Sequence, residues 1–189
     1  MRATPFRPES MDADQRRLYD AIVGGPRGTG PQLFELSDAH GVLNGPFNSF
    51  LLSPKMGESL QSVGVALRFN SRMSPRLREM AILLVAAHWD CDFERYAHER
   101  VGASVGVADA ELETLRRGVP PDSADPSETA GLRLVSQLLT GDVSDDDFAV
   151  ASAALGESML FELSTLVGYY GTLALQLRLF RVGVPSDEA

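Results

Sequence analysis

The sequence of 189 residues contains a single cysteine, Cys91, and a single tryptophan, Trp89. One cysteine cannot form a disulfide within the chain, which fits a reducing cytosol. The chain also lacks a long apolar run, because its most apolar stretch, 80–87, is far shorter than the roughly 20 residues of a bilayer-spanning helix. The first residues, which include Arg2 and Arg7, show no apolar segment typical of a secretory signal. We therefore expect a cytoplasmic protein with no membrane partner.

Basic residues are scarce relative to acidic ones. The chain has 17 lysines and arginines against 26 aspartates and glutamates, which gives a formal net charge of −9. Such a balance repels phosphate backbones, so we expect no nucleic-acid partner. Apolar residues make up 44% of the chain, enough to build a full core, and the length suits one domain. We therefore predict a single domain over 1–189, with its core at about 45–185 and loose termini at 1–10 and 186–189.

Convincing alternation of apolar and polar residues, which would indicate strands, is absent, and helical signals dominate. Ser74-Pro75 is the clearest start signal, because serine caps a helix and proline loses no useful hydrogen bond in the first turn. A run rich in glycine and proline from Gly24 to Pro31 predicts a loop. The sequence thus predicts an all-α, single-domain helical bundle. Its expected helices cover 12–23, short segments that begin at Pro46 and Pro54, and then 74–88, 90–105 (capped by Asp90), 109–117, 127–139, 144–154 and 158–180.

Helical spacing also predicts which residues face the interior. The expected interior positions of the helices that begin at 12 and 54 are Leu18, Ile22, Val23, Leu60, Val63 and Leu67. The segment 158–180 is apolar nearly all round, so we expect a buried helix there. The acidic linker that contains Pro120, Pro121 and Pro126 is expected to be exposed.

Ionisable residues interrupt the inward side of the helix expected at 90–105. On a helical wheel, Cys91, Glu94 and His98 lie with the apolar residues, opposite a charged face. Burying a carboxylate and an imidazole is costly unless they are paired, and residues four apart can meet on a helix surface. If the preceding helix packs antiparallel, Glu79, just before its charge-free stretch, comes nearest to His98. The four residues are therefore a candidate cluster of acid, base and nucleophile.

Each of these residues also has a purely structural interpretation. A Glu–His pair at this spacing is often a surface pair, Glu79 could favour a helix N-terminus, and a lone inward cysteine is usually a small apolar residue. Tyr169 and Tyr170 interrupt an apolar helix; either could line a pocket, although a packed core tyrosine is the more common case. A basic cluster could gather an anionic substrate, or be a solvated face or a subunit contact; its members are Arg68, Arg72, Arg76 and Arg78.

The spacing Glu79-x11-Cys91-x2-Glu94-x3-His98 resembles the signature of the carboxymuconolactone decarboxylase / alkylhydroperoxidase D superfamily. That signature reads Glu-x11-Cys-x2-Cys-x3-His, so Glu94 stands where it has a second cysteine. The segment from Trp89 to His98 is similar to a subgroup with a Trp-x3-Tyr-Glu-Trp-x2-His core. The resemblance covers roughly 45–185, with weaker similarities at Gly45-Pro46-Phe47, Leu67-Arg68-Phe69, Gly168-Tyr169-Tyr170 and Val184-Pro185.

The resemblance implies an all-α fold with the two site helices at its centre. It also implies a homo-oligomer, which we expect to be a dimer or a trimer. Two chemistries occur in the superfamily. In the peroxidase branch, two cysteines cycle through a disulfide while Glu and His activate one thiol. In the decarboxylase branch, a small lactone or related acid is processed with no metal and no organic cofactor, so neither is expected here.

The missing second cysteine favours acid–base chemistry over the peroxidase cycle. Three neighbouring acids are expected to raise the pKa of Cys91, which makes it a pocket residue rather than a nucleophile. His98 would accept or return a proton, Glu79 would orient it or relay its proton, and Glu94 would act as an acid. The expected substrate is a small organic acid, lactone or ketone that undergoes decarboxylation, isomerisation or ring opening. The alternatives are a hydroperoxide reductase that uses Cys91 with an external thiol, and a non-enzymatic oligomer that binds a small molecule.

Overall fold

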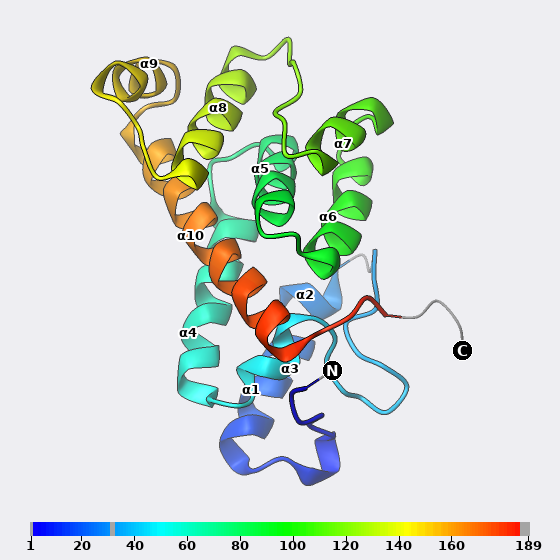
Figure 1. The fold of residues 1–189 in the computed structure, drawn as a ribbon. Coiled ribbons are helices and arrows are strands. Elements are labelled where there is room, and N and C mark those ends of the chain that lie inside the picture. Colours follow the sequence, from blue (N-terminus) through cyan, green and yellow to red (C-terminus); the bar gives the residue numbers. More distant parts are fainter. Residues whose placement is uncertain (1, 31–32, 186–189) are drawn as a thin grey trace.

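The structure, a computed structural model, describes residues 2–30 and 33–185. Within these residues the chain forms ten α-helices, two shorter helical turns and no β-strand (Figure 1). The all-α prediction is confirmed. The elements in chain order are η1 (Pro8–Ser10), α1 (Ala13–Val23), α2 (Pro26–Thr29), α3 (Pro46–Phe50), α4 (Pro54–Val65), η2 (Ala66–Asn70), α5 (Pro75–His88), α6 (Asp92–Ser104), α7 (Asp109–Arg116), α8 (Pro126–Thr140), α9 (Asp145–Leu155) and α10 (Glu157–Phe180).

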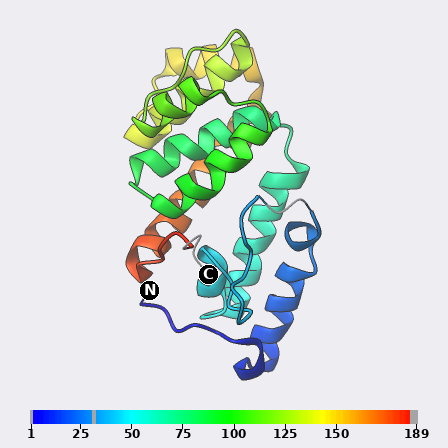
Figure 2. The ribbon, with the colours of Figure 1, turned by 90° about the vertical axis from the view of Figure 1, so that its right-hand side faces the viewer.

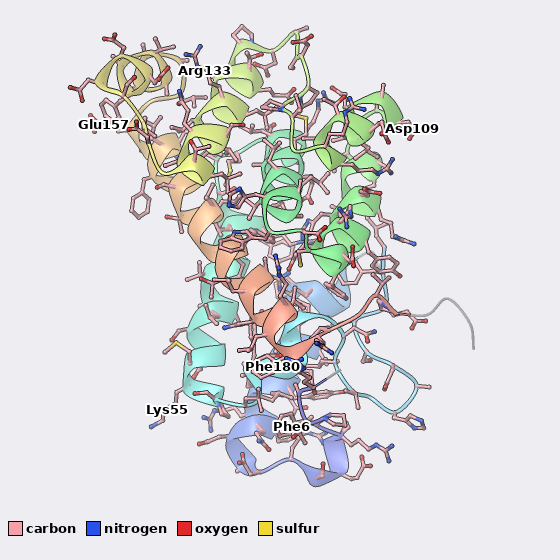
Figure 3. The ribbon with its side chains drawn as sticks, viewed as in Figure 1. Phe6, Lys55, Asp109, Arg133, Glu157 and Phe180 are labelled. Carbon is pink, nitrogen blue, oxygen red and sulfur yellow. The ribbon has the colours of Figure 1, made fainter. Side chains whose placement is uncertain are left out.

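Helix α5 lies at the centre of the molecule. It packs against α6, α7, α8 and α10, and every residue from Glu79 to Ala86 is buried. The long helix α10 contacts α3 and α4 as well as α8 and α9, so it joins the two ends of the molecule (Figures 1 and 2). Arg133 and Glu157 lie at one of these ends, whereas Phe6 and Lys55 lie at the other (Figure 3). The α5–α6 pair sits between the ends, covered by α10 on one side.

The start of α5 follows directly from its sequence. The Ser74 side chain accepts a hydrogen bond from the backbone N–H of Leu77 at 3.0 Å, and Pro75 occupies the first turn. At the start of α6, however, the prediction that Asp90 caps the helix is wrong. Cys91 occupies the N-cap position, while Asp90 has a left-handed φ of 47°. An N-cap residue needs extended backbone, so Asp90 instead supplies the sharp turn between the two helices.

The N-terminal segment is held in place, although the sequence predicted a loose arm over 1–10. The side chain of Asn48 is buried and pairs with the backbone of the segment 2–10. It accepts a hydrogen bond from the N–H of Phe6 at 3.0 Å and donates one to the carbonyl of Thr4 at 2.9 Å. Such a contact between a polar side chain and a distant backbone leaves no periodic signal in the sequence. The remaining residues of the expected loose termini lie outside the described part of the chain.

Several details of the predicted pattern are wrong. Helix α2 forms inside the expected glycine- and proline-rich loop, whose last residue, Pro31, lies outside the described residues. Val23 is 37% exposed because it is the last residue of α1, and Val63 is 36% exposed because it faces a surface groove beside α10. In the proline-containing linker, Pro121 is buried rather than exposed.

Helix α10 is buried along only part of its circumference. Leu163 and Leu166 are fully buried, whereas Phe161, Leu175 and Leu179 are 72%, 51% and 62% exposed. The expected buried helix is therefore only partly buried, and apolar side chains are exposed near both of its ends. No single helix within the described residues is long and apolar enough to cross a bilayer; α9 and α10 meet those criteria only as a pair bent by 112°.

Candidate active site

Helices α5 and α6 run antiparallel and carry the predicted site. The backbone N–H of Cys91 donates to the carbonyl of Ala86 at 2.9 Å, which closes the turn between the helices. Glu79 on α5 thereby comes opposite Glu94 and His98 on α6. All three side chains are buried, since these residues are 1%, 3% and 5% exposed. The convergence that the helical spacing predicted is present.

His98 lies between the two carboxylates. Its Nδ1 is 2.6 Å from Glu79 Oε2, and its Nε2 is 3.2 Å from Glu94 Oε2. On the other side of Glu79, the guanidinium of Arg78 donates from Nε to Oε1 at 3.1 Å. With His98 protonated, Arg78, Glu79, His98 and Glu94 form a buried row of alternating charge. We call these four residues the charged row.

Burial works against charge in this row, but the partners outweigh it. Desolvation would lower the pKa of His98, yet the charges and hydrogen bonds of Glu79 and Glu94 raise it above its ordinary value of 6.5. Desolvation would also raise the pKa of Glu79, yet His98, with help from Arg78 and Arg68, lowers it below 4.5. The imidazolium form of His98 therefore persists to a higher pH than in an ordinary histidine.

Two tyrosines of α10 form the wall beside His98. The Tyr170 ring meets the imidazole edge-on with ring centres 5.3 Å apart, and Tyr169 meets Tyr170 edge-on at 5.2 Å. Burial raises the pKa of Tyr169 to about 12, so its hydroxyl keeps its proton. That hydroxyl is buried and has no hydrogen-bond partner among the described residues.

A small cavity of about 20 Å³ lies against the charged row, and we call it the inner cavity. Glu94, His98 and both tyrosines line it, whereas Glu79 does not. Its volume leaves space for about one water-sized group. Glu94 and His98 are therefore the members of the charged row that a small molecule in this cavity would touch.

A second cavity, of about 70 Å³, adjoins the inner one, and we call it the outer cavity. The two cavities share four lining residues, Arg27, Phe34, Phe47 and Arg68. These side chains come from α2, α3, η2 and the segment between α2 and α3. The outer cavity thus approaches the inner cavity across a wall of two aromatic rings and two guanidinium groups.

Cys91 lies apart from this arrangement. It is 2% exposed and lines neither the inner nor the outer cavity. Burial is the largest cause that raises the pKa of its thiol to about 11, with smaller effects from neighbouring acids. The predicted direction is correct, but desolvation rather than negative charge dominates. Cys91 packs in a small apolar cluster with Phe93, Ala97, Ala174 and Leu177.

The four arginines expected to form one basic cluster have different partners. Arg76 pairs with carboxylates of α7 and α8, and Arg78 pairs with Glu79. Arg72 is exposed and bonds α10 through its backbone N–H. Of the four, Arg68 alone lines the inner and outer cavities. Arg78 stays beside Arg68, because its Nη1 donates to the Arg68 carbonyl at 2.9 Å, whereas Arg72 and Arg76 contact other elements.

Two lining residues, Arg27 and Phe34, were missed by the sequence analysis. Arg27 lies in a segment rich in glycine and proline, and Phe34 lies in an irregular connection, so neither belongs to a periodic pattern. Their place in the site depends on how the connection between α2 and α3 packs against α6 and α10. Among the described residues, no group of three or more His, Cys, Asp and Glu side chains could hold a metal ion.

Comparison with known proteins gives matches at the level of structure. No family model and no curated protein matches the sequence. One similar structure is an uncharacterized peroxidase-related protein from Ralstonia eutropha JMP134 with an alkylhydroperoxidase AhpD core. It superposes with a TM-score of 0.76 at 12% identity, and the match covers 98% of this chain and 93% of that chain. A peroxidase-related protein from Silicibacter sp. TM1040 gives 0.69 at 9% identity, covering 94% and 88%. ATU0492 from Agrobacterium tumefaciens, a protein of unknown function suggested to be an AhpD antioxidant defence protein, gives 0.65 at 18% identity, covering 76% and 100%.

The protein has the alkylhydroperoxidase D fold. The fold that the superfamily resemblance implied is confirmed, whereas the superfamily and its subgroup stay predictions. In this AhpD-like fold, α5 carries Glu79 and α6 carries Glu94 and His98, as the signature spacing predicted. At identities between 9% and 18% the likeness extends to the fold alone, so the chemistry must be argued from the site.

Proposed function

We propose that the protein is an acid–base enzyme that transfers protons at carbon in a small organic acid, lactone or ketone. Its catalytic residues are Glu94 and His98. The supporting observation is that these two members of the buried charged row line the inner cavity. A histidine with a shifted pKa that lines a cavity beside a carboxylate is typical of catalytic sites.

His98 stores the proton in this proposal. Its Nδ1 faces Glu79, so a proton can leave toward the cavity only from Nε2, which faces Glu94. Glu79 does not line the cavity and is a positioning residue: it fixes the ring and favours the imidazolium. Glu94 touches both Nε2 and the cavity, so it passes the proton between His98 and the substrate.

A decarboxylation can be written with these groups. The bond between the substrate carbon and its carboxylate breaks, carbon dioxide leaves, and the electron pair stays on the substrate as an enolate. A proton from His98, passed by Glu94, then bonds to that carbon. Water returns a proton to His98, and the hydroxide that remains combines with the carbon dioxide to give bicarbonate. In an isomerisation the ionised Glu94 instead removes a proton from one carbon, and the site returns it at another. Both routes are proton transfers and use no electron acceptor.

The hydroperoxide-reductase alternative rests on the peroxidase-related names of two structural neighbours. The chain itself offers less support. With a pKa of about 11, Cys91 holds little thiolate at neutral pH, and thiolate is the reactive form. A sulfenic acid formed there has no second cysteine in the chain to resolve it. The remaining alternative, a non-enzymatic binding protein, requires that loss of Glu94 change stability or binding but no reaction.

A substrate screen tests the proposal. The protein is incubated with small oxo acids, unsaturated lactones and ketones, and NMR follows the loss of each compound and the appearance of product. We expect turnover of at least one compound, reduced about 100-fold or more by Glu94→Gln because the proton path is cut. Glu99→Gln is the matched control, since this carboxylate lies on the same helix but pairs with Arg116. No turnover across the panel, or an equal loss in both variants, would contradict the proposal.

We further propose that this enzyme works in the cytoplasm as a homo-oligomer. A groove of about 240 Å³ between α4 and α10 is lined by Val63, Leu67 and Phe161, and Phe161 is 72% exposed. Contiguous exposed apolar surface is typical of protein contacts. The single buried free cysteine supports a reducing compartment.

A further inference from the structure

The wall shared by the inner and outer cavities is cationic. Arg27 and Arg68 line both cavities, together with the rings of Phe34 and Phe47. The guanidinium carbon of Arg27 lies 5.2 Å from the centre of the Phe47 ring, which supports the side chain from below. In a chain with a net charge of −9, the approach to Glu94 and His98 therefore carries positive charge.

Arg68 lacks a carboxylate partner of the kind that neighbouring arginines have. Arg76 and Arg78 each lie 3.1 Å from a buried carboxylate. Arg68 forms no ion pair within the described part of the chain, although Glu79 attracts it from a greater distance. Burial lowers the pKa of Arg68, which shows that its charge is partly removed from water. An anionic ligand would offset this cost through charge-assisted hydrogen bonds.

Tyr169 lines the same inner cavity as Arg68, and its hydroxyl lacks a hydrogen-bond partner among the described residues. Tyr169 is 5% exposed, and the hydroxyl itself is buried. A buried hydroxyl left without a partner destabilises a protein, so its presence indicates a ligand that supplies one.

Gly64 of α4 lies close to two polar groups, the hydroxyl of Tyr169 and the guanidinium of Arg27. A methyl group placed on Gly64 would lie 2.4 Å from the hydroxyl of Tyr169 and 2.6 Å from Nη2 of Arg27. The absence of a side chain on α4 therefore leaves room for both groups at one point of the cavity wall. A larger residue at this position would displace them without removing either.

We propose that Arg68, Arg27 and Tyr169 bind a carboxylate that the substrate keeps throughout the reaction. The substrate is then an organic acid rather than a neutral lactone or ketone. Arg68 supplies paired N–H donors to the carboxylate, and the hydroxyl of Tyr169 donates to one of its oxygens. The reacting carbon lies in the inner cavity, whose small volume restricts it to a short group. The placement of the reacting carbon rests on the proposed function, whereas the anion site does not.

Isothermal titration calorimetry with simple probes tests the anion site. The probes are pyruvate and succinate, the corresponding neutral amides, and inorganic phosphate. We expect the carboxylates to bind and the amides not to bind. Arg68→Gln should weaken carboxylate binding about 10- to 100-fold, because a charged hydrogen-bond donor is lost, and Tyr169→Phe should weaken it less. Tighter binding of phosphate than of carboxylate, lost in Arg68→Gln, would uphold the anion site but change the ligand to a phosphate group.

Arg68→Gln and Gly64→Ala are each paired with a control variant at a position outside the anion site. Arg72→Gln removes an exposed neighbouring arginine and should leave binding unchanged. Gly64→Ala should block the site, whereas Gly168→Ala, which meets nothing within 4 Å, should not. Because Gly64→Ala could also lower stability, its unfolding is measured alongside, and the Arg68→Gln result decides. Equal losses in Arg68→Gln and Arg72→Gln, equal binding of amides, or no binding of any anion would overturn the inference.

The same titrations separate this inference from the proposed function. Glu94→Gln should retain carboxylate binding while losing turnover. If native protein binds carboxylates through Arg68 but converts no substrate, the anion site stands and the proposed function fails. If the native protein converts neutral lactones or ketones as fast as acids and Arg68→Gln has no effect, the proposed function stands and the anion site fails.

Discussion

Glu79 accepts the Nδ1 proton of His98 across 2.6 Å, although the two residues are 19 positions apart and belong to different helices. The second oxygen of Glu79 is held by Arg78, so the carboxylate is fixed from both sides. Because Glu79 lines no part of the inner cavity, its role is to hold the ring and to stabilise the imidazolium. Glu79 therefore provides position and charge, and proton transfer takes place at the other end of the imidazole.

This contact sets a pH range for stability. Folding raises the pKa of His98 above 6.5, so its contribution is complete below 6.5 and is lost as the pH rises through the folded pKa. Folding lowers the pKa of Glu79 below 4.5, so its contribution is complete above 4.5 and is lost as the pH falls through the folded pKa. The free energy of unfolding in urea should therefore be greatest between 4.5 and 6.5. His98→Gln should flatten the decline above this range, and a native profile that rises instead would argue against the charged row.

Loss of Glu79 should be strongly destabilising. Glu79→Gln leaves Arg78 and His98 buried beside a neutral amide, and breaking a buried pair on one side costs roughly 3–5 kcal/mol. Glu113→Gln is the control, because its ion pairs are largely exposed and should contribute less than about 1 kcal/mol. Urea denaturation monitored by circular dichroism measures both values. Equal and small effects would show that the buried row does not stabilise the fold.

Cys91 should be inert toward peroxide. With a thiol pKa of about 11 and no exposure to either cavity, it should react slowly with peroxide and with thiol reagents at neutral pH. A peroxide-consumption assay with a dithiol reductant is therefore expected to show little turnover. His98→Ala should damage the native activity more than Cys91→Ser does, because proton transfer needs the imidazole. Rapid peroxide turnover that Cys91→Ser abolishes would restore the peroxidase interpretation.

The apolar groove between α4 and α10 should form a contact between copies of the chain. Light scattering is expected to give a multiple of 20.4 kDa, a dimer or a trimer. Phe161 is 72% exposed beside the groove between α4 and α10, so Phe161→Glu should place a charge in the contact and shift the assembly toward monomer. Glu157→Gln, at the exposed start of the same helix, should change nothing. A native monomer at all concentrations would refute the proposed assembly.

The parts of the fold that follow from periodicity were predictable. The start of α5 at Ser74, the all-α class and the approach of Glu79 to His98 depend on helix spacing and on one antiparallel turn. The sequence could not show which side of a helix stays uncovered. Phe161 is as apolar as Leu163, but only Leu163 meets a neighbouring helix, so the helix was expected to be buried all round.

The site was only partly predictable for the same reason. Glu94 and His98 share one helix, so their contact follows from a spacing of four residues. The wall containing Arg27 and Arg68 joins residues far apart in the sequence, and only tertiary packing brings them to one cavity. Cys91 shows the opposite case: it lies one turn from Glu94 in sequence, yet it packs in an apolar cluster and does not line the cavity.

Incorporation of solvent deuterium at carbon is the most direct test of the account. The protein is incubated in D₂O with the best substrate of the screen, and NMR measures the label at the carbon that loses or gains a proton. The account predicts incorporation by the native protein and by Cys91→Ser, and a loss of about 100-fold or more in His98→Gln, because His98 supplies the transferred proton. Incorporation that persists in His98→Gln but disappears in Cys91→Ser would contradict it.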